Sequence, residues 1–307
     1  MRGRSAALGE AAASAVEDLD SPLDFVRWGA SCFAEYGLYF GHGTDNAVDE
    51  AMSLVLHALH LKPDVPDALL EAKLTRDDKD RILSLLRRRI ETRKPAAYLT
   101  NEAWFAGLSF YVDERVLVPR SPLAEWIERG FEPWIDADRV YRVLDFATGS
   151  GCIAVACAMA FPGATVDASD VSAEALEVAG LNVRRHQLTE RVKLIQSDGF
   201  DALQGGYDLI VSNPPYVPDD SYRNLPEEYL HEPEIGLRAG ADGLYIVASM
   251  MNEAPRFMNP GALLVVEVGE AREALAARFS SLPFLWLDFE RGGDDVFALT
   301  KEQMADC

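Results

Sequence analysis

From Val140 onwards, runs of apolar and β-branched residues alternate with segments of helical periodicity. Strands are expected at 140–146, 164–169, 192–197, 207–212 and 262–268, and helices near 151–160, 172–185 and 242–257. This alternation is typical of parallel strands, because the crossover between two parallel strands is long enough to hold a helix that covers the sheet. The pattern therefore predicts an open α/β sheet with helices on both faces.

The end of the chain departs from this rhythm. A helix expected at 270–279 is followed by strands at 284–289 and 295–300, and Gly292-Gly293 lie in the connection between the strands. Two strands joined by so short a connection must run antiparallel. With the five earlier strands they predict a Rossmann-like sheet of seven strands that ends in an antiparallel hairpin.

The N-terminal third of the chain has helical patterning instead. Helices are expected at about 21–36, opened by Ser21-Pro22, at 45–61, and at 75–93. We expect residues 1–94 to form a small helical domain, with 1–20 as a disordered tail or a frayed first helix. Arg87-Arg88-Arg89 are interpreted as a solvated helix face, with a contact to substrate or RNA as the alternative.

Residues 95–120 differ in composition from both of their neighbours. The aromatic segment 104–112 is β-prone, Asp113-Glu114 can turn the chain, and 115–118 can return it before Pro119. We therefore predict a β-hairpin linker over 95–120, followed by the α/β domain over 121–307.

Length and charge narrow the possible functions. The chain has 307 residues, 49% of them hydrophobic, which is enough for two domains with apolar cores. Its net charge of −21 argues against binding nucleic acid through a broad basic surface. The charge suits a soluble protein, or one that attracts a basic partner.

The sequence indicates neither export nor a metal site. Acidic residues interrupt the N-terminal segment, which argues against a signal peptide, and no apolar run approaches roughly 18 residues, so no membrane-spanning helix is expected. The four cysteines form no CxxC pair and no zinc-type cluster with histidine. We therefore expect no metal and a cytoplasmic location.

The first predicted strand of the sheet runs into a glycine-containing turn and then a helix. Gly149 and Gly151 let the backbone approach a ligand at the helix N-terminus. Asp170 follows the second strand, where a carboxylate can bind two ribose hydroxyls. Gly149-x-Gly151-x-x-Ala154 also fits a dinucleotide fold, and a purely structural turn is a further alternative.

Two features favour S-adenosylmethionine as the cofactor. Asp145 lies inside the end of the first strand, where its carboxylate can face the amino acid end of the cofactor. The terminal antiparallel hairpin is the second feature, because methyltransferases of this class resemble a doubly wound fold with one reversed strand. Asp198, after the third strand, is expected near the adenine, with a helix N-cap as the alternative.

Asn213-Pro214-Pro215-Tyr216 follow the fourth strand, and ligands of open α/β sheets bind beyond the carboxyl ends of the strands. The prolines have no N–H, so carbonyl acceptors remain without competing donors. The Asn213 side-chain oxygen and the Pro214 carbonyl can each accept one N–H of a planar NH₂ group, and the Tyr216 ring can pack on it. The loop thus predicts methylation of an amide nitrogen, with a structural Pro-Pro turn as the alternative.

The two motifs together resemble the protein N(5)-glutamine methyltransferases, a HemK/PrmC-like family that modifies release factors and ribosomal proteins. Within this family the chain resembles the PrmB branch, which methylates a glutamine of large-subunit ribosomal protein three. The release-factor branch would show an acidic residue and Thr after Pro-Arg-Pro, where this chain has Arg120-Ser121-Pro122. The resemblance is carried further by segments 97–105, 110–122, 225–229 and 231–234, and it covers roughly residues 21–300.

The resemblance implies transfer of a methyl group from S-adenosylmethionine to a glutamine side chain of a basic large-subunit ribosomal protein. It implies that the helical domain recognises the protein substrate. The expected catalytic residues are Asn213, Pro214 and Tyr216, and the substrate-binding residues are these three with Pro215. The expected cofactor-binding residues are Asp145, Ala147, Thr148, Gly149, Gly151, Asp170, Val171, Asp198, Gly199, Phe200 and Asn213.

The chain departs from the family pattern in two places. Release-factor enzymes often carry a Trp after the residue that matches Asp198, whereas this chain has Gly199-Phe200, which leaves open whether Phe200 replaces that Trp. Phe146-Ala147 stand where a Leu-Gly or Leu-Cys pair is more usual.

Three other functions remain as alternatives. A release-factor glutamine methyltransferase is one, and a nucleic-acid amino-group methyltransferase is another, although it would need base flipping and a basic groove. A non-catalytic adaptor is the third. Segment 219–234 carries six acidic residues, and it is interpreted either as a solvated loop or as an acidic rim that attracts a basic protein.

Overall fold

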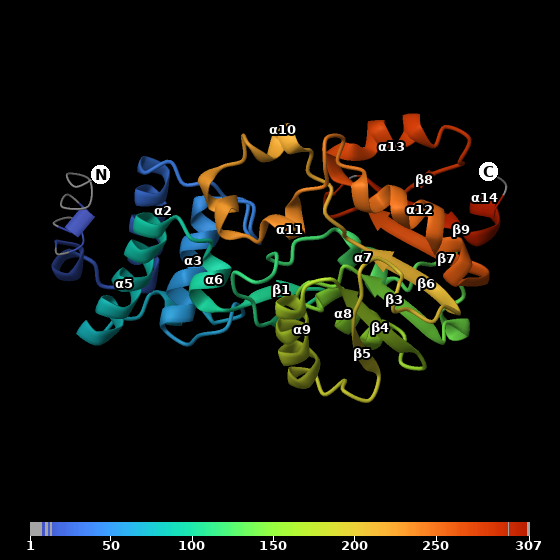
Figure 1. The fold of residues 1–307 in the computed structure, drawn as a ribbon. Coiled ribbons are helices and arrows are strands. Elements are labelled where there is room, and N and C mark those ends of the chain that lie inside the picture. Colours follow the sequence, from blue (N-terminus) through green and yellow to red (C-terminus); the bar gives the residue numbers. More distant parts are fainter. Residues whose placement is uncertain (1–7, 10–11, 13, 294, 306–307) are drawn as a thin grey trace. The chain divides into compact units, whose positions relative to one another are not determined.

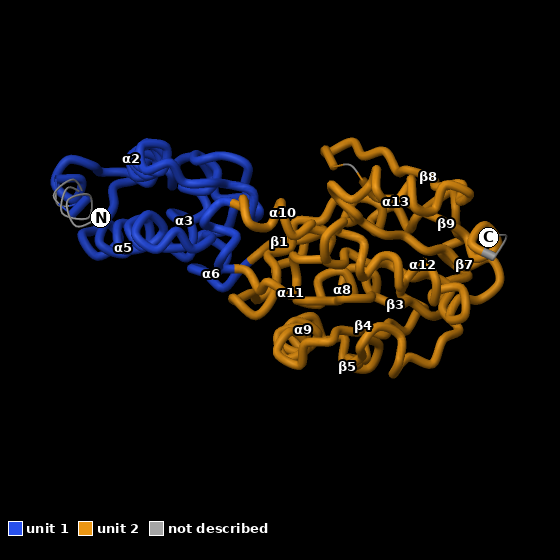
Figure 2. Tube along the Cα trace, turned by 45° about the horizontal axis from the view of Figure 1, so that its top comes forward, with its two compact units in different colours: residues 1–102, 226–231 blue, residues 103–225, 232–307 orange. Residues whose placement is uncertain are grey.

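The computed structural model describes residues 8, 9, 12, 14–293 and 295–305. The chain divides into two compact units, residues 1–102 with 226–231, and residues 103–225 with 232–307 (Figure 2). Segment 226–231 therefore belongs to the helical unit, although it lies far along the chain from the other residues of that unit. In the part of the chain that the structure describes, no helix combines the length and apolar character needed to cross a membrane.

The helical unit contains the three helices predicted from the sequence, and two of them begin as predicted. The Ser21 and Thr75 side chains each accept a hydrogen bond from the backbone N–H three residues on, and Asp24 and Asp78 complete the two capping boxes. Asn46 caps the remaining helix. The helices are α2 (Pro22–Glu35), α3 (Ala47–Ala58), α4 (Asp67–Leu70), α5 (Arg76–Thr92) and α6 (Ala96–Thr100).

Of the two alternatives for residues 1–20, the described residues of that segment fit a first helix and not a disordered tail. Residues 8, 9, 12 and 14–18 are helical. Leu8, Ala12, Ala15 and Leu19 recur every three or four residues and are buried in the core of the helical unit. The apolar stripe thus supplies the packing that stabilises this helix. Residues 1–7, 10–11 and 13 lie outside the described part.

The linker contains a β-hairpin, but its turn is not where we predicted it. Strands β1 (Ala103–Phe105) and β2 (Leu108–Phe110) pair antiparallel around Ala106-Gly107. Both turn residues have positive φ, 48° and 71°, which matches the twist of a two-residue hairpin. Asp113-Glu114 begin a separate turn, in which the Val116 N–H donates to the Asp113 carbonyl at 3.1 Å, but this turn is not part of the β1–β2 hairpin.

The second unit contains the predicted seven-stranded sheet (Figure 1). The strand order is β5-β4-β3-β6-β7-β9-β8; the first five strands pair in parallel, and β9 runs antiparallel to both of its neighbours. Strands β8 and β9 form the predicted terminal antiparallel hairpin, so the expected fold class is confirmed. The strands are β3 (Arg142–Phe146), β4 (Thr165–Asp170), β5 (Val192–Gln196), β6 (Tyr207–Ser212), β7 (Met258–Glu267), β8 (Leu285–Trp286) and β9 (Val296–Thr300).

Helices cover both faces of this sheet (Figure 1). On β6, Leu209 and Val211 pack in one apolar cluster and Ile210 packs in the other, because successive side chains of a strand point to opposite faces. The first cluster includes α7 (Leu123–Glu128), α8 (Cys152–Ala160) and α9 (Ala173–Arg185), and the second includes α12 (Tyr245–Phe257), α13 (Arg272–Arg278) and α14 (Lys301–Ala305). The short helices α10 (Asp219–Tyr222) and α11 (Glu234–Leu237) lie in the segment between β6 and α12.

Candidate functional site

The predicted cofactor and substrate loops leave the carboxyl ends of neighbouring strands. Phe146, the last residue of β3, pairs with Ser169 of β4 on one side and with Ser212 of β6 on the other. The Ser212 hydroxyl also donates to the Phe146 carbonyl at 2.7 Å. From β3 the chain adds β4 and β5 on one side, and then β6 and β7 on the other. Open α/β sheets bind ligands at the point where the strand order changes side in this way. The structure thus brings the glycine loop, Asp170 and Asn213 to one edge of the sheet.

Asp145 is fully buried beneath the glycine loop. One of its oxygens, Oδ2, accepts hydrogen bonds from the Thr148 hydroxyl and from the Ala154 N–H at 2.9 Å. The other, Oδ1, is buried and finds no hydrogen-bond donor among the described residues. Burial raises the pKa of Asp145 to about 7, against the lowering effect of the two donors. Buried polar atoms are nearly always hydrogen-bonded, so Asp145 Oδ1 is a candidate acceptor for a donor on a bound ligand.

The glycine loop between β3 and α8 adopts a backbone conformation that requires glycine at two positions. Gly149 and Gly151 have φ of 54° and 78°, a region that L-residues with side chains rarely adopt. A Cβ on Gly151 would lie 3.1 Å from the Ala179 Cβ of α9, so the helix packs directly on this glycine. A Cβ on Gly149 would meet nothing within 4 Å, so this side of the loop is open. Ala147, which stands where the family pattern has glycine or cysteine, also has a positive φ of 58°.

Asp170 at the end of β4 organises the same loop. Its Oδ2 accepts the Gly149 N–H and its Oδ1 accepts the Ser172 N–H, both at 2.9 Å. Burial raises the pKa of Asp170 above its ordinary value. Each oxygen keeps a second lone pair, so the carboxylate is both a support for the glycine loop and an acceptor for a ligand hydroxyl. Val171 beside it is 45% exposed, unusual for a valine at a strand end.

The aromatic ring of Phe200 lies in the core and not at the ligand edge. It is 2% exposed, and its centroid lies 4.9 Å from that of Phe146 and 4.7 Å from that of Phe257. The Phe200 ring is therefore packed between Phe146 and Phe257 in an apolar cluster. Asp198 is exposed and no helix follows it directly, which removes the N-cap interpretation.

The hydroxyl of Tyr216 is held by residues that sequence reasoning missed. It donates to Glu267 Oε1 at 2.9 Å, and the Ser121 hydroxyl donates to Glu267 Oε2 at 2.5 Å. Glu267 is the last residue of β7, the strand beside β6, and burial raises its pKa. The sequence offered one signal for Glu267, which is an acidic residue at the end of an apolar run.

Two glycines make room for Tyr216. A Cβ on Gly269 would lie 2.4 Å from Cε2 of the Tyr216 ring, and a Cβ on Gly243 would lie 2.4 Å from the Tyr216 carbonyl oxygen. Both distances are far inside van der Waals contact, so any side chain at either position would displace the tyrosine. The ring of Tyr216 is thus fixed on one face by Gly269 and at its hydroxyl by Glu267.

Replacing Gly269 by alanine is expected to lower methyl transfer by about 10²-fold, because a displaced Tyr216 no longer aligns the substrate loop. Steady-state turnover measures the effect. Gly261→Ala is the matched control, because Gly261, which lies in β7, also has a positive φ, 75°, but a Cβ there would meet nothing within 4 Å. Equal losses in both variants would show that backbone strain, and not Tyr216, causes the effect.

Segment 219–234, interpreted as a solvated loop or as an acidic rim, pairs its six acidic residues with four arginines. Each of the six acidic residues of segment 219–234 has an arginine partner in its own unit. Asp219 and Glu234 pair with Arg238, Asp220 with Arg223, Glu227 and Glu228 with Arg93, and Glu232 with Arg120. This segment therefore offers far less free negative charge to a basic partner than its composition indicates.

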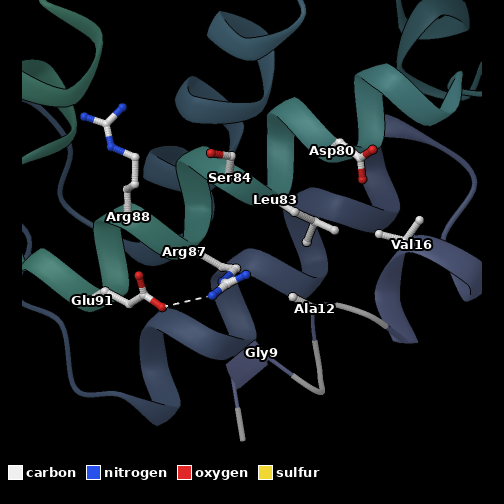
Figure 3. A pocket seen from close by; sticks show the side chains of 9 residues that line it. All are labelled: Gly9, Ala12, Val16, Asp80, Leu83, Ser84, Arg87, Arg88 and Glu91. Atoms are coloured by element: carbon white, nitrogen blue, oxygen red, sulfur yellow. Dashed lines mark hydrogen bonds and ion pairs between the residues drawn. The ribbon is translucent and has the colours of Figure 1, made fainter. Parts of the chain in front are cut away.

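A cavity of about 440 Å³ in the helical unit is separate from these residues (Figure 3). It is lined by Gly9, Ala12, Val16, Asp80, Leu83, Ser84, Arg87, Arg88 and Glu91. Figure 3 shows Arg87 and Glu91 paired across 3.2 Å, so these two charges satisfy each other. No predicted site residue lines the cavity. Among the residues that the structure describes, no group of three or more His, Cys, Asp or Glu could hold a metal ion.

The chain is similar to known methyltransferases. The Methyltransferase small domain family model matches residues 133–273. The crystal structure of the hMettl16 catalytic domain in complex with MAT2A 3'UTR hairpin 1 has a TM-score of 0.51 at 16% identity, covering 82% of this chain and 89% of that one. At such low identity the likeness shows the fold alone.

Two relatives share much more sequence. A ribosomal protein uL3 glutamine methyltransferase of Neisseria meningitidis serogroup B is 49% identical over 291 residues, which cover 94% of this chain and 96% of that protein. The protein of the same name from Xanthomonas campestris pv. campestris is 49% identical over 288 residues, 94% of this chain and 93% of that protein. Identity this high, over nearly the whole length, includes both units. The chain belongs to the family of ribosomal protein uL3 glutamine methyltransferases.

Proposed function

We propose that this protein transfers a methyl group from S-adenosylmethionine to the side-chain amide nitrogen of a glutamine in ribosomal protein uL3. The observation that carries the proposal is the position of Asn213-Pro214-Pro215-Tyr216 directly after β6, beside the glycine loop that follows β3. The similarity to uL3 glutamine methyltransferases over 94% of the chain supports the choice of substrate.

Asn213 and Pro214 hold the substrate amide in this proposal. The Asn213 side-chain oxygen and the Pro214 carbonyl accept the two N–H groups of the glutamine, and the prolines supply no competing N–H. An amide nitrogen is a weak nucleophile because its lone pair is delocalised, so its orientation has to contribute much of the rate. In this transfer the N–CH₃ bond would form as the S–CH₃ bond of the sulfonium breaks, which leaves a neutral thioether, and the nitrogen would then lose one proton to water.

The residues at the carboxyl ends of β3 and β4 fit the groups of S-adenosylmethionine. S-adenosylmethionine supplies an electrophilic methyl group on its sulfonium. The orphan Oδ1 of Asp145 matches an ammonium donor, and Asp170 offers lone pairs to ribose hydroxyls. In this proposal the adenine packs on Val171, which is 45% exposed, and on the backbone around Asp198 and Gly199. Ala147, Thr148, Gly149 and Gly151 form the loop that supports these contacts.

Cofactor binding is expected to release a proton near neutral pH. Asp145 has a pKa of about 7, so much of it is protonated at pH 6 to 7, and an ammonium group at Oδ1 favours the ionised form. Calorimetry in buffers of different ionisation enthalpy measures the proton release, which Asp145→Asn should abolish. Binding heats that do not depend on the buffer would contradict the assignment.

The same shift affects stability in the absence of the cofactor. The folded-state pKa of Asp145 is raised from 3.8 to about 7, so the folded chain binds a proton that the unfolded chain has lost. The stabilising contribution is therefore present below pH 3.8 and is lost as the pH rises through about 7. Denaturant unfolding at pH 6 and pH 8 is expected to show the wild type losing more stability than Asp145→Asn.

The direct test is transfer of labelled methyl groups into separated ribosomal proteins, release factors and DNA. Label in the uL3 band, removed by replacing the target glutamine with alanine, is the expected result. Label in release factors with none in uL3 would show that the substrate is a release factor, as in the other branch of the family. Label in DNA alone would overturn the assignment of a protein substrate.

A further inference from the structure

Two consecutive residues, Arg120 and Ser121, contact both ends of the segment that follows the Asn213 motif. Ser121 binds Glu267, whose other oxygen holds Tyr216 at the start of this segment. Arg120 donates two hydrogen bonds to Glu232 at 2.7 and 2.8 Å, near the end of the segment. The chain between Tyr216 and Glu232 is thus fixed at both ends by neighbouring residues of one short stretch.

These contacts are buried from solvent. Ser121 is 7% exposed, Glu267 6% and Glu232 4%. The Val118 N–H also donates to Glu232 Oε1 at 2.9 Å, so this carboxylate receives three donors from the stretch 118–120. Buried carboxylates cannot exchange a lost protein donor for water without cost, so their hydrogen bonds define geometry more strictly than surface pairs do.

We propose that the stretch Val118–Ser121 is a clamp that sets the conformation of the glutamine-binding loop. Ser121 and Glu267 are positioning residues in this proposal, since they act on the substrate through Tyr216. Arg120 acts in the same way on the far end of the segment through Glu232. The inference rests on the proposed function, because it concerns how the same loop presents a protein glutamine.

The clamp has a specific chemical requirement at position 121. Glu267 Oε1 is taken by the Tyr216 hydroxyl, and Oε2 faces the Ser121 hydroxyl. Removing that hydroxyl leaves a buried carboxylate oxygen without its donor, and the Tyr216 hydroxyl is the neighbouring donor that can move to compensate. A shift of Tyr216 then moves Asn213 and Pro214, which lie within three residues of it.

The experiment compares Ser121→Ala with Ser121→Thr in the full-length protein. Alanine is expected to lower kcat for uL3 by about tenfold or more, because loss of alignment slows the chemical step, while the Kd for S-adenosylmethionine stays within about twofold. Threonine keeps the hydroxyl and is expected to restore most of the turnover. Ser249→Ala is the matched control, because Ser249 also donates to a carboxylate, Glu253, at 2.6 Å in the same unit.

Arg120→Lys tests the other end of the clamp. Lysine keeps the positive charge but cannot make the two-pronged contact with Glu232. We expect a rise of several-fold in the KM for uL3 with the same cofactor affinity. Turnover and KM equal to wild type in both Ser121→Ala and Arg120→Lys would overturn the proposal.

Hydrogen exchange separates this inference from the proposed function. The Val217 N–H donates to the Leu237 carbonyl at 2.9 Å, and it reports directly on the segment that the clamp holds. Faster exchange of Val217 in Ser121→Ala than in Ser249→Ala supports the clamp, even if the wild type methylates a protein other than uL3. Unchanged exchange at Val217 would overturn the clamp whatever the substrate.

Discussion

Replacing Asn213 by alanine is expected to lower the turnover number for uL3 by about 10³-fold while cofactor affinity stays unchanged. The side-chain oxygen of Asn213 is one of two acceptors proposed to hold the substrate NH₂, and a positioned polar group of this kind contributes roughly 10²–10³ in rate. Single-turnover methyl transfer with saturating cofactor measures the chemical step, and equilibrium binding of the cofactor is measured separately.

Asn224→Ala is the control for this prediction. Asn224 lies in the same segment after β6, but it is exposed and its amide donates to the Asp220 carbonyl at 2.9 Å. Its loss is expected to change turnover by less than about twofold, as for other surface substitutions. Near wild-type turnover in Asn213→Ala would end the role proposed for that residue, and weaker cofactor binding would reassign it to the cofactor.

The sheet could be predicted closely because its signals are local. The expected strand 207–212 matches β6, and the apolar run and its flanking residues define it without information from elsewhere in the chain. The capping boxes at Ser21 and Thr75 likewise depend on residues three apart. The motif at Asn213 could be placed at a strand end for the same reason.

The contacts that complete the site could not be predicted in this way. Ser121 and Glu267 are separated by 146 residues along the chain, and Tyr216 and Glu267 by 51. Only the strand order, which places β7 beside β6, brings Glu267 to Tyr216. Phe200 is the converse case, since its position two residues after Asp198 does not show that its ring is buried in the core.

A run of charged residues does not show which of its side chains are exposed, as Arg87-Arg88-Arg89 illustrate. We predicted that all three lie on a solvated helix face, which is wrong for Arg89, because its side chain is fully buried. Arg89 Nε donates to Glu50 Oε1 at 2.6 Å and Nη2 donates to the Tyr39 carbonyl at 2.9 Å. Glu228, also fully buried, lies 3.7 Å from Arg89 Nη1. The face that Arg89 occupies is therefore the inner face of α5.

Replacing Arg89 by methionine is expected to destabilise the helical unit by about 3–5 kcal/mol. Methionine fills similar volume but leaves the Glu50 carboxylate, 1% exposed, without its arginine in a buried site. Breaking a buried ion pair from one side carries this cost because the remaining charge is desolvated and uncompensated. Arg88→Met is the matched control, since Arg88 is exposed on the same helix and is expected to change stability by about 0.5 kcal/mol or less.

Thermal unfolding of the full-length protein, with and without S-adenosylmethionine, measures this difference. A ligand stabilises the part that binds it, so the transition that does not shift with cofactor reports the helical unit. Arg89→Met should lower that transition and Arg88→Met should not, whereas equal midpoints would show that the buried cluster contributes little.

The loss of stability has a kinetic consequence. Segment 226–231, which carries Glu228, belongs to the helical unit and is continuous in sequence with the segment that follows Tyr216. Local unfolding of the helical unit therefore also releases segment 226–231, which lies between Tyr216 and Glu232. Arg89→Met is accordingly expected to raise the KM for uL3 at temperatures below its unfolding midpoint, while the affinity for S-adenosylmethionine is retained.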